Sequence, residues 1–121
     1  MRKKHFHTRA IHVGNIPDSE TGAVSVPLHL TSTYEQEKVG IHKGFDYSRA
    51  GNPTRSCFEE NIASLEGGKY GISFASGMAA ITALFQILKQ GDHVIIGRNV
   101  YGGTYRMAVD VLSKHGFEFE F

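Results

Sequence analysis

The sequence predicts an α/β fold with a largely parallel sheet, on the basis of three observations. From residue 53 onward, segments with helical spacing of apolar residues alternate with short segments of β type. The connections between these segments are short and contain glycine. The last five residues, Phe117–Phe121, alternate with the period of two that is typical of a strand. Alternation of helix and strand is the pattern of helices packed on a parallel sheet.

The first predicted helix begins at Pro53 and ends before Gly67. Asn52 is a favourable N-cap, and proline is favoured at the first helical position. The two glycines Gly67 and Gly68 are a typical helix stop. An apolar face follows the i, i+4, i+7 spacing of a helix and consists of Phe58, Ile62 and Leu65. Residues 70–74 are then expected to form a short buried strand.

A second helix is expected after Ser76, which can cap it, and Gly91 is the expected stop. Its apolar face consists of Met78, Ile81, Leu84, Phe85 and Leu88. The β-branched run at 93–96 predicts the next strand. A third helix is predicted by the spacing of Tyr105, Ala108, Val109 and Leu112, and it ends at Gly116. Residues 117–121 are the last predicted strand.

Residues 1 to about 45 have no sustained helical periodicity and contain scattered glycines and prolines, so loops are expected there. The predicted organisation is an N-terminal arm at 1–45 and the first part of an α/β domain at 46–121. Only about three strands are visible, whereas a parallel sheet normally has helices on both faces. The chain also stops inside a strand, which leaves an unfinished edge. We expect the N-terminal part of a longer protein.

Composition excludes several classes of function. The 121 residues are 40% hydrophobic and 21% charged, which is typical of a globular domain. A formal net charge of +1 favours neither a nucleic-acid nor an anionic-membrane partner. No apolar run follows the basic start, so neither a signal peptide nor a membrane span is expected. The single cysteine, Cys57, excludes an intrachain disulfide and favours a cytoplasmic location.

Tyr47 and Arg49 lie two residues apart, just before a Gly-Asn-Pro turn sequence. Residues with this spacing share one face of an extended strand, so both side chains can reach one target. An arginine fork binds a phosphate through two hydrogen bonds, and a tyrosine hydroxyl can donate a third. The pair predicts a phosphate site. The alternative is a solvated turn residue beside a surface arginine.

A second candidate phosphate site is the sequence Ser76-Gly77-Met78. It follows a predicted strand and opens a helix, where free backbone N–H groups and the helix dipole attract an anion. Gly77 allows a ligand to approach the backbone closely. Tyr101 follows the next strand, and its flat ring could stack on a planar heterocycle. The alternatives are an ordinary capped turn and a packing tyrosine.

Seven histidines raise the question of a metal site, above all His5, His7 and His12. Zinc sites combine close pairs with cysteine or carboxylate partners at set spacing, and the only cysteine lies far from these histidines. We expect no metal site. Cys57 lies near a helix start, which can lower the pKa of a thiol, but no partner base is identifiable. Its expected role is packing.

The run Tyr47–Thr54 (YSRAGNPT) resembles the signature of the Cys/Met-metabolism enzymes that use pyridoxal 5'-phosphate (PLP). These are the cystathionine γ-synthases, γ-lyases and β-lyases with their sulfhydrylase relatives. The resemblance extends over nearly the whole chain, in the order and spacing of that family. It is carried further by Thr8–Gly14, Thr21–Val24, Thr31–Tyr34, Ser76–Ala80 and Val100–Thr104.

The resemblance implies the fold and the site. The fold would be the large domain of a fold-type-I PLP-dependent transferase (aspartate-aminotransferase-like), incomplete here and preceded by an extended arm that contacts a neighbouring subunit. The amides of Gly77 and Met78 would hold the PLP phosphate. Tyr101 would stack on the cofactor ring and exchange protons with the substrate. Tyr47 and Arg49 would bind the phosphate of the neighbouring subunit's PLP, so the enzyme would be a homodimer or homotetramer with shared sites.

Two groups that PLP chemistry requires are expected downstream of this segment. One is a lysine that bonds covalently to the cofactor, and the other is an acid that keeps its ring nitrogen protonated. None of the seven lysines falls in a matching context; they are Lys3, Lys4, Lys38, Lys43, Lys69, Lys89 and Lys114. The 121 residues alone are therefore expected to be inactive.

The expected function is β- or γ-elimination or replacement on a sulfur amino acid such as cystathionine. Gly103 stands where methionine γ-lyases carry a cysteine, which argues against that branch. Asn99 replaces an acid that is common in the family. Lyase, synthase and sulfhydrylase are not separated. The alternative is a non-catalytic, truncated chain that keeps only oligomer and phosphate contacts.

Overall fold

The computed structural model describes residues 5–121. The chain divides into two compact units, Met1–Ser73 and Phe74–Phe121. This division says which residues pack together within one chain, and it does not test the predicted arm and domain. The arm at 1–45, its contact with a neighbouring subunit and the domain at 46–121 remain predictions.

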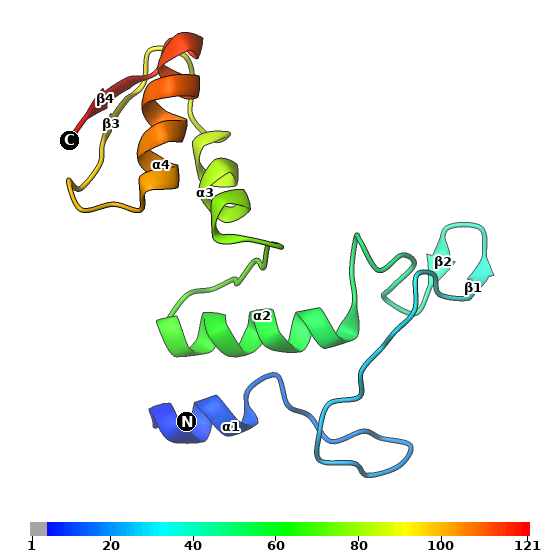
Figure 1. The fold of residues 1–121 in the computed structure, drawn as a ribbon. Coiled ribbons are helices and arrows are strands. Elements are labelled where there is room, and N and C mark those ends of the chain that lie inside the picture. The colour runs from blue at the N-terminus through cyan, green and yellow to red at the C-terminus, as the bar shows by residue number, and fades with distance from the viewer. Residues whose placement is uncertain (1–4) are drawn as a thin grey trace. The chain divides into compact units, whose positions relative to one another are not determined.

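Helix α2 (Pro53–Glu66) is the main element of the first unit, and its ends are those predicted (Figure 1). The side chain of Asn52 accepts a hydrogen bond from the amide of Thr54 at 2.9 Å, and Pro53 occupies the first turn. Gly67 ends the helix in the left-handed conformation, with φ of 71°. All three signals are local, which is why the sequence was sufficient to place this helix.

A short helix, α1 (Phe6–His12), lies beside α2 (Figure 1) and was not predicted. It has no side-chain N-cap, and none of its residues is buried. Asn61 of α2 anchors its end by donating from Nδ2 to the carbonyl oxygen of Val13 at 2.7 Å. The guanidinium of Arg9 donates to the carbonyl oxygen of Ser64. This helix therefore depends on contacts with α2 that periodicity does not reveal.

The chain also approaches α2 closely just after α1. A Cβ at Gly14 would lie 2.2 Å from the carbonyl oxygen of Cys57, and Gly14 has a φ of +75°. Only glycine satisfies both the space and the conformation. Residues 13–45 are mostly irregular, as predicted, apart from the antiparallel pair β1 (Gln36–Lys38) and β2 (Ile41–His42).

The strand predicted at 70–74 is wrong: these residues are irregular. The amide and hydroxyl of Ser73 both donate to Glu59 Oε1 of α2, at 2.8 and 2.7 Å. A Cβ at Gly71 would lie 2.3 Å from the carbonyl oxygen of Glu59. This segment is held against a helix instead of pairing with a strand.

Helix α3 (Gly77–Phe85) begins as predicted, because Ser76 Oγ accepts a hydrogen bond from the amide of Ala79 at 3.1 Å. It ends at Phe85, before the expected stop at Gly91. Leu84, which belongs to the predicted apolar face, is 65% exposed, whereas Phe85 on the same predicted face is buried.

The second unit is a strand–helix–strand unit with a parallel pair, as predicted (Figure 1). β3 (His93–Ile95) pairs in parallel with β4 (Glu118–Glu120), and Val94 lies opposite Phe119. Between them run α4 (Gly102–Arg106), a π-helical turn (Met107–Val111) and a 3₁₀ turn (Leu112–His115). The sequence predicted one regular helix here.

The core of this unit consists of Phe85, Ile96 and Ala108. Phe119 packs edge-on against Phe85, with ring centres 5.9 Å apart. Ala108 is fully buried, so the helical segment that connects β3 to β4 packs closely in this cluster. The core thus joins α3, the parallel pair and the crossover between the two strands.

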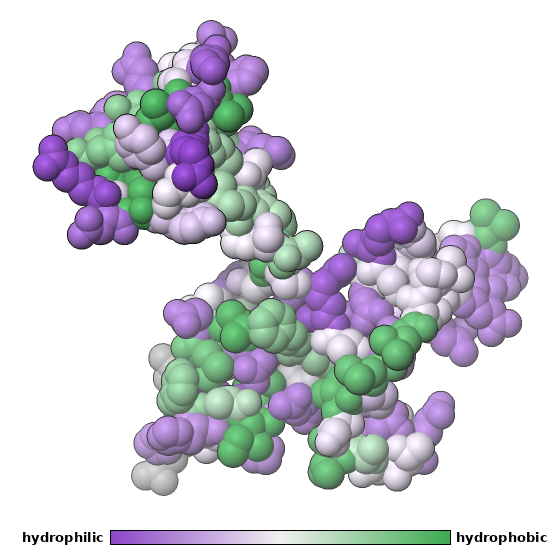
Figure 2. Space-filling view, viewed as in Figure 1, coloured by the Kyte–Doolittle hydropathy of each residue, from purple (hydrophilic) through white to green (hydrophobic). Residues whose placement is uncertain are grey.

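Several large apolar side chains are exposed in both units (Figure 2). They include Phe58 and Ile62, which belong to the predicted apolar face of α2, and Ile95 of β3, which is 75% exposed. Within residues 5–121, no helix combines the length and the apolar character that crossing a membrane requires.

Candidate functional site

Tyr47 and Arg49 are in contact, but they do not share the face of an extended strand as predicted. Tyr47 forms an isolated antiparallel bridge with Thr33, and the chain turns directly after it. Its carbonyl oxygen accepts hydrogen bonds from the amides of Ala50 and Gly51, each at 2.9 Å. The guanidinium carbon of Arg49 lies 4.3 Å from the centre of the Tyr47 ring. A turn, and not the pleat of a strand, brings the two side chains together.

Two side chains at the start of α2, those of Arg55 and of the N-cap residue Asn52, fix this turn. Arg55 donates to the carbonyl oxygens of Ser48 at 3.2 Å and Ala50 at 2.9 Å. Asn52 Nδ2 donates to Ser48 Oγ at 3.2 Å and to the carbonyl oxygen of His29 at 3.0 Å. The turn that carries Arg49 is therefore held at the start of α2, by the side chain of Arg55 and by that of Asn52.

Arg49 itself is exposed and, among residues 5–121, takes part in no ion pair. A guanidinium has five N–H donors in a planar fork, and stacking on a ring leaves the edge of that fork available. The arrangement can present a cation to an anionic ligand. That this ligand is a PLP phosphate remains a prediction.

The start of α3 has the features of an anion site. Ser76 Oγ accepts a hydrogen bond from the amide of Ala79 at 3.1 Å. The carbonyl oxygen of Ser76 accepts one from the amide of Ala80, also at 3.1 Å. The amides of Gly77 and Met78 have no partner among the described residues. A Cβ at Gly77 would meet nothing within 4 Å, so the space beside it is open. Two free N–H groups and the positive helix end thus meet at an accessible point.

Tyr101 lies in the same unit, directly before α4, and is 68% exposed. Its carbonyl oxygen accepts the amide of Thr104 at 2.9 Å, which joins Tyr101 to the first turn of the helix. A Cβ at Gly103 would lie 2.6 Å from Tyr101 Cε1 and 3.0 Å from Met78 Sδ. The Tyr101 ring and the Met78 side chain therefore both lie close to Gly103.

The five predicted site residues form two groups, one in each unit. Tyr47 and Arg49 belong to the first unit, and Gly77, Met78 and Tyr101 to the second. Within each group the structure brings the residues together. Their roles toward a cofactor remain predictions.

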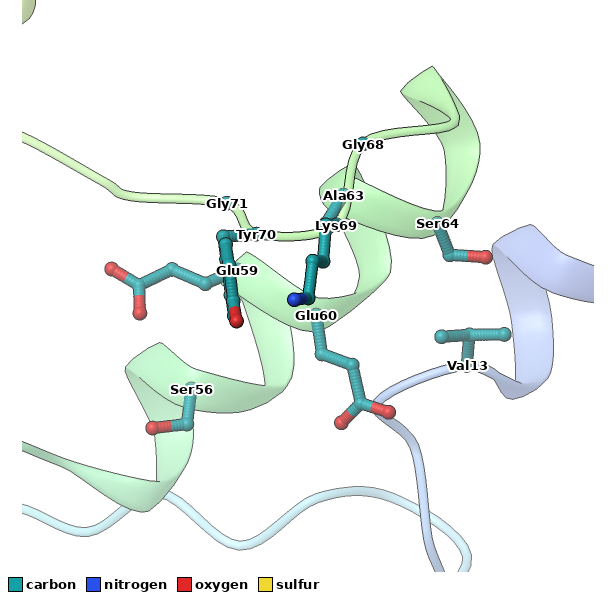
Figure 3. A pocket seen from close by; sticks show the side chains of 10 residues that line it. All are labelled: Val13, Ser56, Glu59, Glu60, Ala63, Ser64, Gly68, Lys69, Tyr70 and Gly71. Carbon is teal, nitrogen blue, oxygen red and sulfur yellow. The ribbon is translucent and has the colours of Figure 1, made fainter.

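A cleft of about 460 Å³ in the first unit contains none of these residues (Figure 3). It lies between α2 and the loop that follows the helix. Glu59 and Glu60 extend from the helix, while Lys69 and Tyr70 come from the loop (Figure 3). Lys69 Nζ lies 5.1 Å from the centre of the Tyr70 ring.

Glu59 is a residue of this cleft that the sequence analysis did not single out. Burial alone would raise the pKa of Glu59, but the two hydrogen bonds from Ser73 and the charge of Arg55 lower it overall. Arg55 Nε lies 3.6 Å from the same carboxylate oxygen. The only sequence signal was the i, i+4 spacing of Arg55 and Glu59, which is common on helices.

The Cys57 thiol was expected to have a packing role. Its pKa is raised, first by burial and then by the charge of Glu60, so the nearby helix start does not activate it. Among residues 5–121, no three histidine, cysteine or acidic side chains gather as metal ligands would.

Comparison with known proteins identifies the relatives of this chain. The model of the family "Cys/Met metabolism PLP-dependent enzyme" matches residues 7–121. A probable cystathionine gamma-synthase of Herpetosiphon aurantiacus is 53% identical over 116 residues, 96% of this chain and 36% of the relative. A cystathionine gamma-lyase of Bacillus subtilis (strain 168) is 50% identical over 121 residues, 100% of this chain and 31% of the relative.

The solved structure of metB from Corynebacterium glutamicum superposes with a TM-score of 0.92 at 43% identity. The match covers 97% of this chain and 31% of that one, and it confirms the predicted fold class. The chain spans about a third of the length of the relatives it matches. Because the family model accounts for nearly every described residue, the chain belongs to the Cys/Met metabolism PLP-dependent enzyme family.

Proposed function

We propose that residues 1–121 supply the N-terminal part of a PLP-dependent transsulfuration enzyme. It acts on sulfur amino acids such as cystathionine, by β- or γ-elimination or replacement. The observation that carries this proposal is the family match over residues 7–121. Relatives that match over nearly all of this chain are about three times longer, which supports a role as one part of a larger enzyme.

The start of α3 fits the cofactor of this family. The phosphate of PLP needs hydrogen-bond donors and positive charge, and the free amides of Gly77 and Met78 supply both at one accessible point. Ser76 stabilises the first turn of α3, because its Oγ accepts a hydrogen bond from the amide of Ala79. Bound PLP supplies an electron sink for reactions at the α-carbon of an amino acid.

Each of the other site residues has a proposed role. Tyr101 stacks on the cofactor ring, and its hydroxyl takes part in proton transfer with the substrate. Its exposed ring beside Met78 is consistent with a face open to a ligand. Tyr47 and Arg49 reach into the neighbouring subunit and bind the phosphate held there. The exposed guanidinium stacked on Tyr47 supports this role.

Shared sites imply an assembly of at least two subunits, and we propose a homodimer that pairs into a homotetramer in the cytoplasm. The N-terminal arm would contribute to the contact between subunits. The exposed Phe58 and Ile62 are consistent with apolar surface that further protein covers. No nucleic acid and no membrane is part of this proposal.

The alternative, a non-catalytic chain that keeps only oligomer or phosphate contacts, is not favoured, because the matching proteins are named as enzymes. The choice between synthase and lyase stays open, since relatives of both names match at similar identity. Gly103 in place of cysteine argues against the methionine γ-lyase branch.

The test begins with the intact mass of the native protein, which reports whether the polypeptide continues beyond residue 121. The full-length protein is then purified with and without PLP and given cystathionine. Release of a thiol and a keto acid that depends on PLP is the expected result. A native protein of only 121 residues, or a full-length protein that neither binds PLP nor reacts, would refute the proposal.

A further inference from the structure

Arg49 and Arg55 use their guanidinium groups in opposite ways. Every nitrogen of the Arg55 guanidinium is engaged within the chain. Nη1 donates to the carbonyl oxygen of Ser48 at 3.2 Å, Nη2 donates to that of Ala50 at 2.9 Å, and Nε lies 3.6 Å from Glu59 Oε1. The guanidinium of Arg49, by contrast, has no hydrogen bond or ion pair within residues 5–121 and only stacks on a ring. Arg55 therefore holds the chain together, and Arg49 is available to a ligand.

The two carbonyl oxygens that Arg55 binds belong to the residues on either side of Arg49. One planar guanidinium thus fixes the backbone just before and just after the residue that carries the available cation. The same turn holds the Tyr47 ring, because the carbonyl oxygen of Tyr47 accepts the amides of Ala50 and Gly51. The direction in which the stacked pair points therefore depends on Arg55.

Glu59 keeps Arg55 in this orientation. Its Oε1 faces Arg55 Nε from the next turn of α2 and also accepts the amide and the hydroxyl of Ser73, at 2.8 and 2.7 Å. Because two other donors fix this oxygen, it is an immobile partner for the arginine. The side chains of Arg55 and Glu59 are 35% and 22% exposed, so water screens their attraction less than that of a fully exposed pair.

We propose that Arg55 is a positioning residue for cofactor binding, which sets where Tyr47 and Arg49 lie and so how well they bind the phosphate of PLP. This inference rests on the function proposed above, in which the pair reaches the phosphate held by the neighbouring subunit. Arg55 does not contact the cofactor, since its nitrogens are engaged within the chain. Holding the pair in its binding orientation lowers the entropy lost when the anion arrives.

The main experiment measures PLP affinity by equilibrium dialysis in the full-length protein. Arg55→Lys keeps the charge and the helix propensity but replaces the planar fork with a single ammonium. Binding should weaken roughly 3- to 20-fold, because the turn then spends only part of its time in the binding orientation. The control is Arg106→Lys, the same change at an exposed position of α4 whose side chain has no hydrogen bond or ion pair within residues 5–121. It should stay within about twofold of the parent protein. Equal affinities in the two variants would overturn the inference.

A mutant cycle tests whether Arg55 acts through the pair. The background Tyr47→Phe/Arg49→Ala lacks both phosphate donors of the turn, so Arg55→Lys should change its PLP affinity by less than about twofold. An undiminished effect there would mean that Arg55 binds the cofactor itself or acts on the whole fold, and would refute positioning. If Arg55→Lys does not fold, Arg55→Gln replaces it in both comparisons. Failure of both variants to fold would count against the inference, because Arg55 would then be a residue of the fold.

A cofactor-free measurement separates this inference from the proposed function. In the protein without PLP, the amides of Ala50 and Gly51 should exchange hydrogen roughly 3- to 20-fold faster in Arg55→Lys than in the parent. Amides in the middle of α2 should keep their parent rates, whereas a general loss of stability would speed up both sets. Unchanged exchange at Ala50 and Gly51 would refute the positioning role, whatever the cofactor affinity. Lack of PLP binding by the parent protein would refute the proposed function alone.

Discussion

The guanidinium of Arg49 stacks on the ring of Tyr47, 4.3 Å from its centre, at a turn that Arg55 and Asn52 anchor to α2. Stacking restricts the long arginine side chain before any ligand arrives, so less conformational entropy is lost on binding an anion. The pair behaves as one preorganised unit.

Arg49→Ala in the full-length protein should weaken PLP retention and leave the subunit folded. A charge-assisted hydrogen bond is worth about 1.5–3 kcal/mol, or roughly 10- to 150-fold in affinity. Dialysis followed by absorbance measures the cofactor retained. Lys38→Ala, at an exposed position in β1, is the control for loss of one positive charge. Equal retention in both variants would remove Arg49 from the site.

Mixing subunits tests whether sites are shared. If Arg49 serves the neighbouring subunit, a dimer of one Arg49→Ala subunit and one Tyr101→Ala subunit has one intact site and one doubly altered site. Random mixing should then restore about a quarter of the parent activity, since half the dimers are mixed and each has one good site of two. Activity no higher than in either variant alone would place both residues in the same subunit's site.

Tyr101→Phe should separate stacking from proton transfer. The phenylalanine ring preserves the stacking surface, so PLP affinity should change little. Loss of the hydroxyl should lower turnover by a factor of order 10²–10⁴ if it acts as a positioned acid or base. Tyr101→Ala should weaken PLP binding as well. Parent-like binding and turnover in both variants would leave Tyr101 as a packing residue.

The elements that the sequence predicted correctly are those with local signals. Asn52, Pro53 and Gly67 mark the ends of α2, and Ser76 marks the start of α3. The parallel pairing of β3 and β4 followed from two strand patterns with a helical pattern between them. Each of these features depends on residues close together in the chain.

The features that the sequence did not predict depend on contacts between distant residues. The strand expected at 70–74 is absent because the amide of Ser73 bonds to Glu59, fourteen positions earlier. Helix α1 was missed because Asn61 and Ser64 hold it from α2. The sequence likewise could not predict that Met78 and Tyr101 both lie close to Gly103, although it predicted each of them as a site residue.

The isolated 121-residue chain should show no turnover of cystathionine when PLP is supplied. It spans 31–36% of its relatives' length, and none of its seven lysines lies in a context that matches the cofactor-binding lysine of the family. Keto-acid release is measured beside the full-length protein. Turnover that disappears when one of these lysines is replaced would contradict the proposed division of the site.

Glu59 should make stability depend on pH through its contact with Ser73. Burial opposes ionisation, but the hydrogen bonds from Ser73 and the charge of Arg55 outweigh it, so the folded pKa is below the ordinary value of 4.5. Glu59 is therefore ionised and stabilising above about pH 4.5, and this contribution is lost as the pH falls through the lower, folded pKa.

Glu59→Gln in the full-length protein replaces charge-assisted hydrogen bonds with neutral ones and should cost about 1–2 kcal/mol at pH 7. The difference from the parent should shrink as the pH falls below 4.5 toward the lower, folded pKa of Glu59. Urea unfolding at pH 7 and at pH 3 measures it. Glu60→Gln is the control, because Glu60 is the next residue of α2 and is exposed. A constant difference between pH 7 and pH 3, or the same loss in Glu60→Gln, would show that the charge on Glu59 does not hold Ser73 against α2.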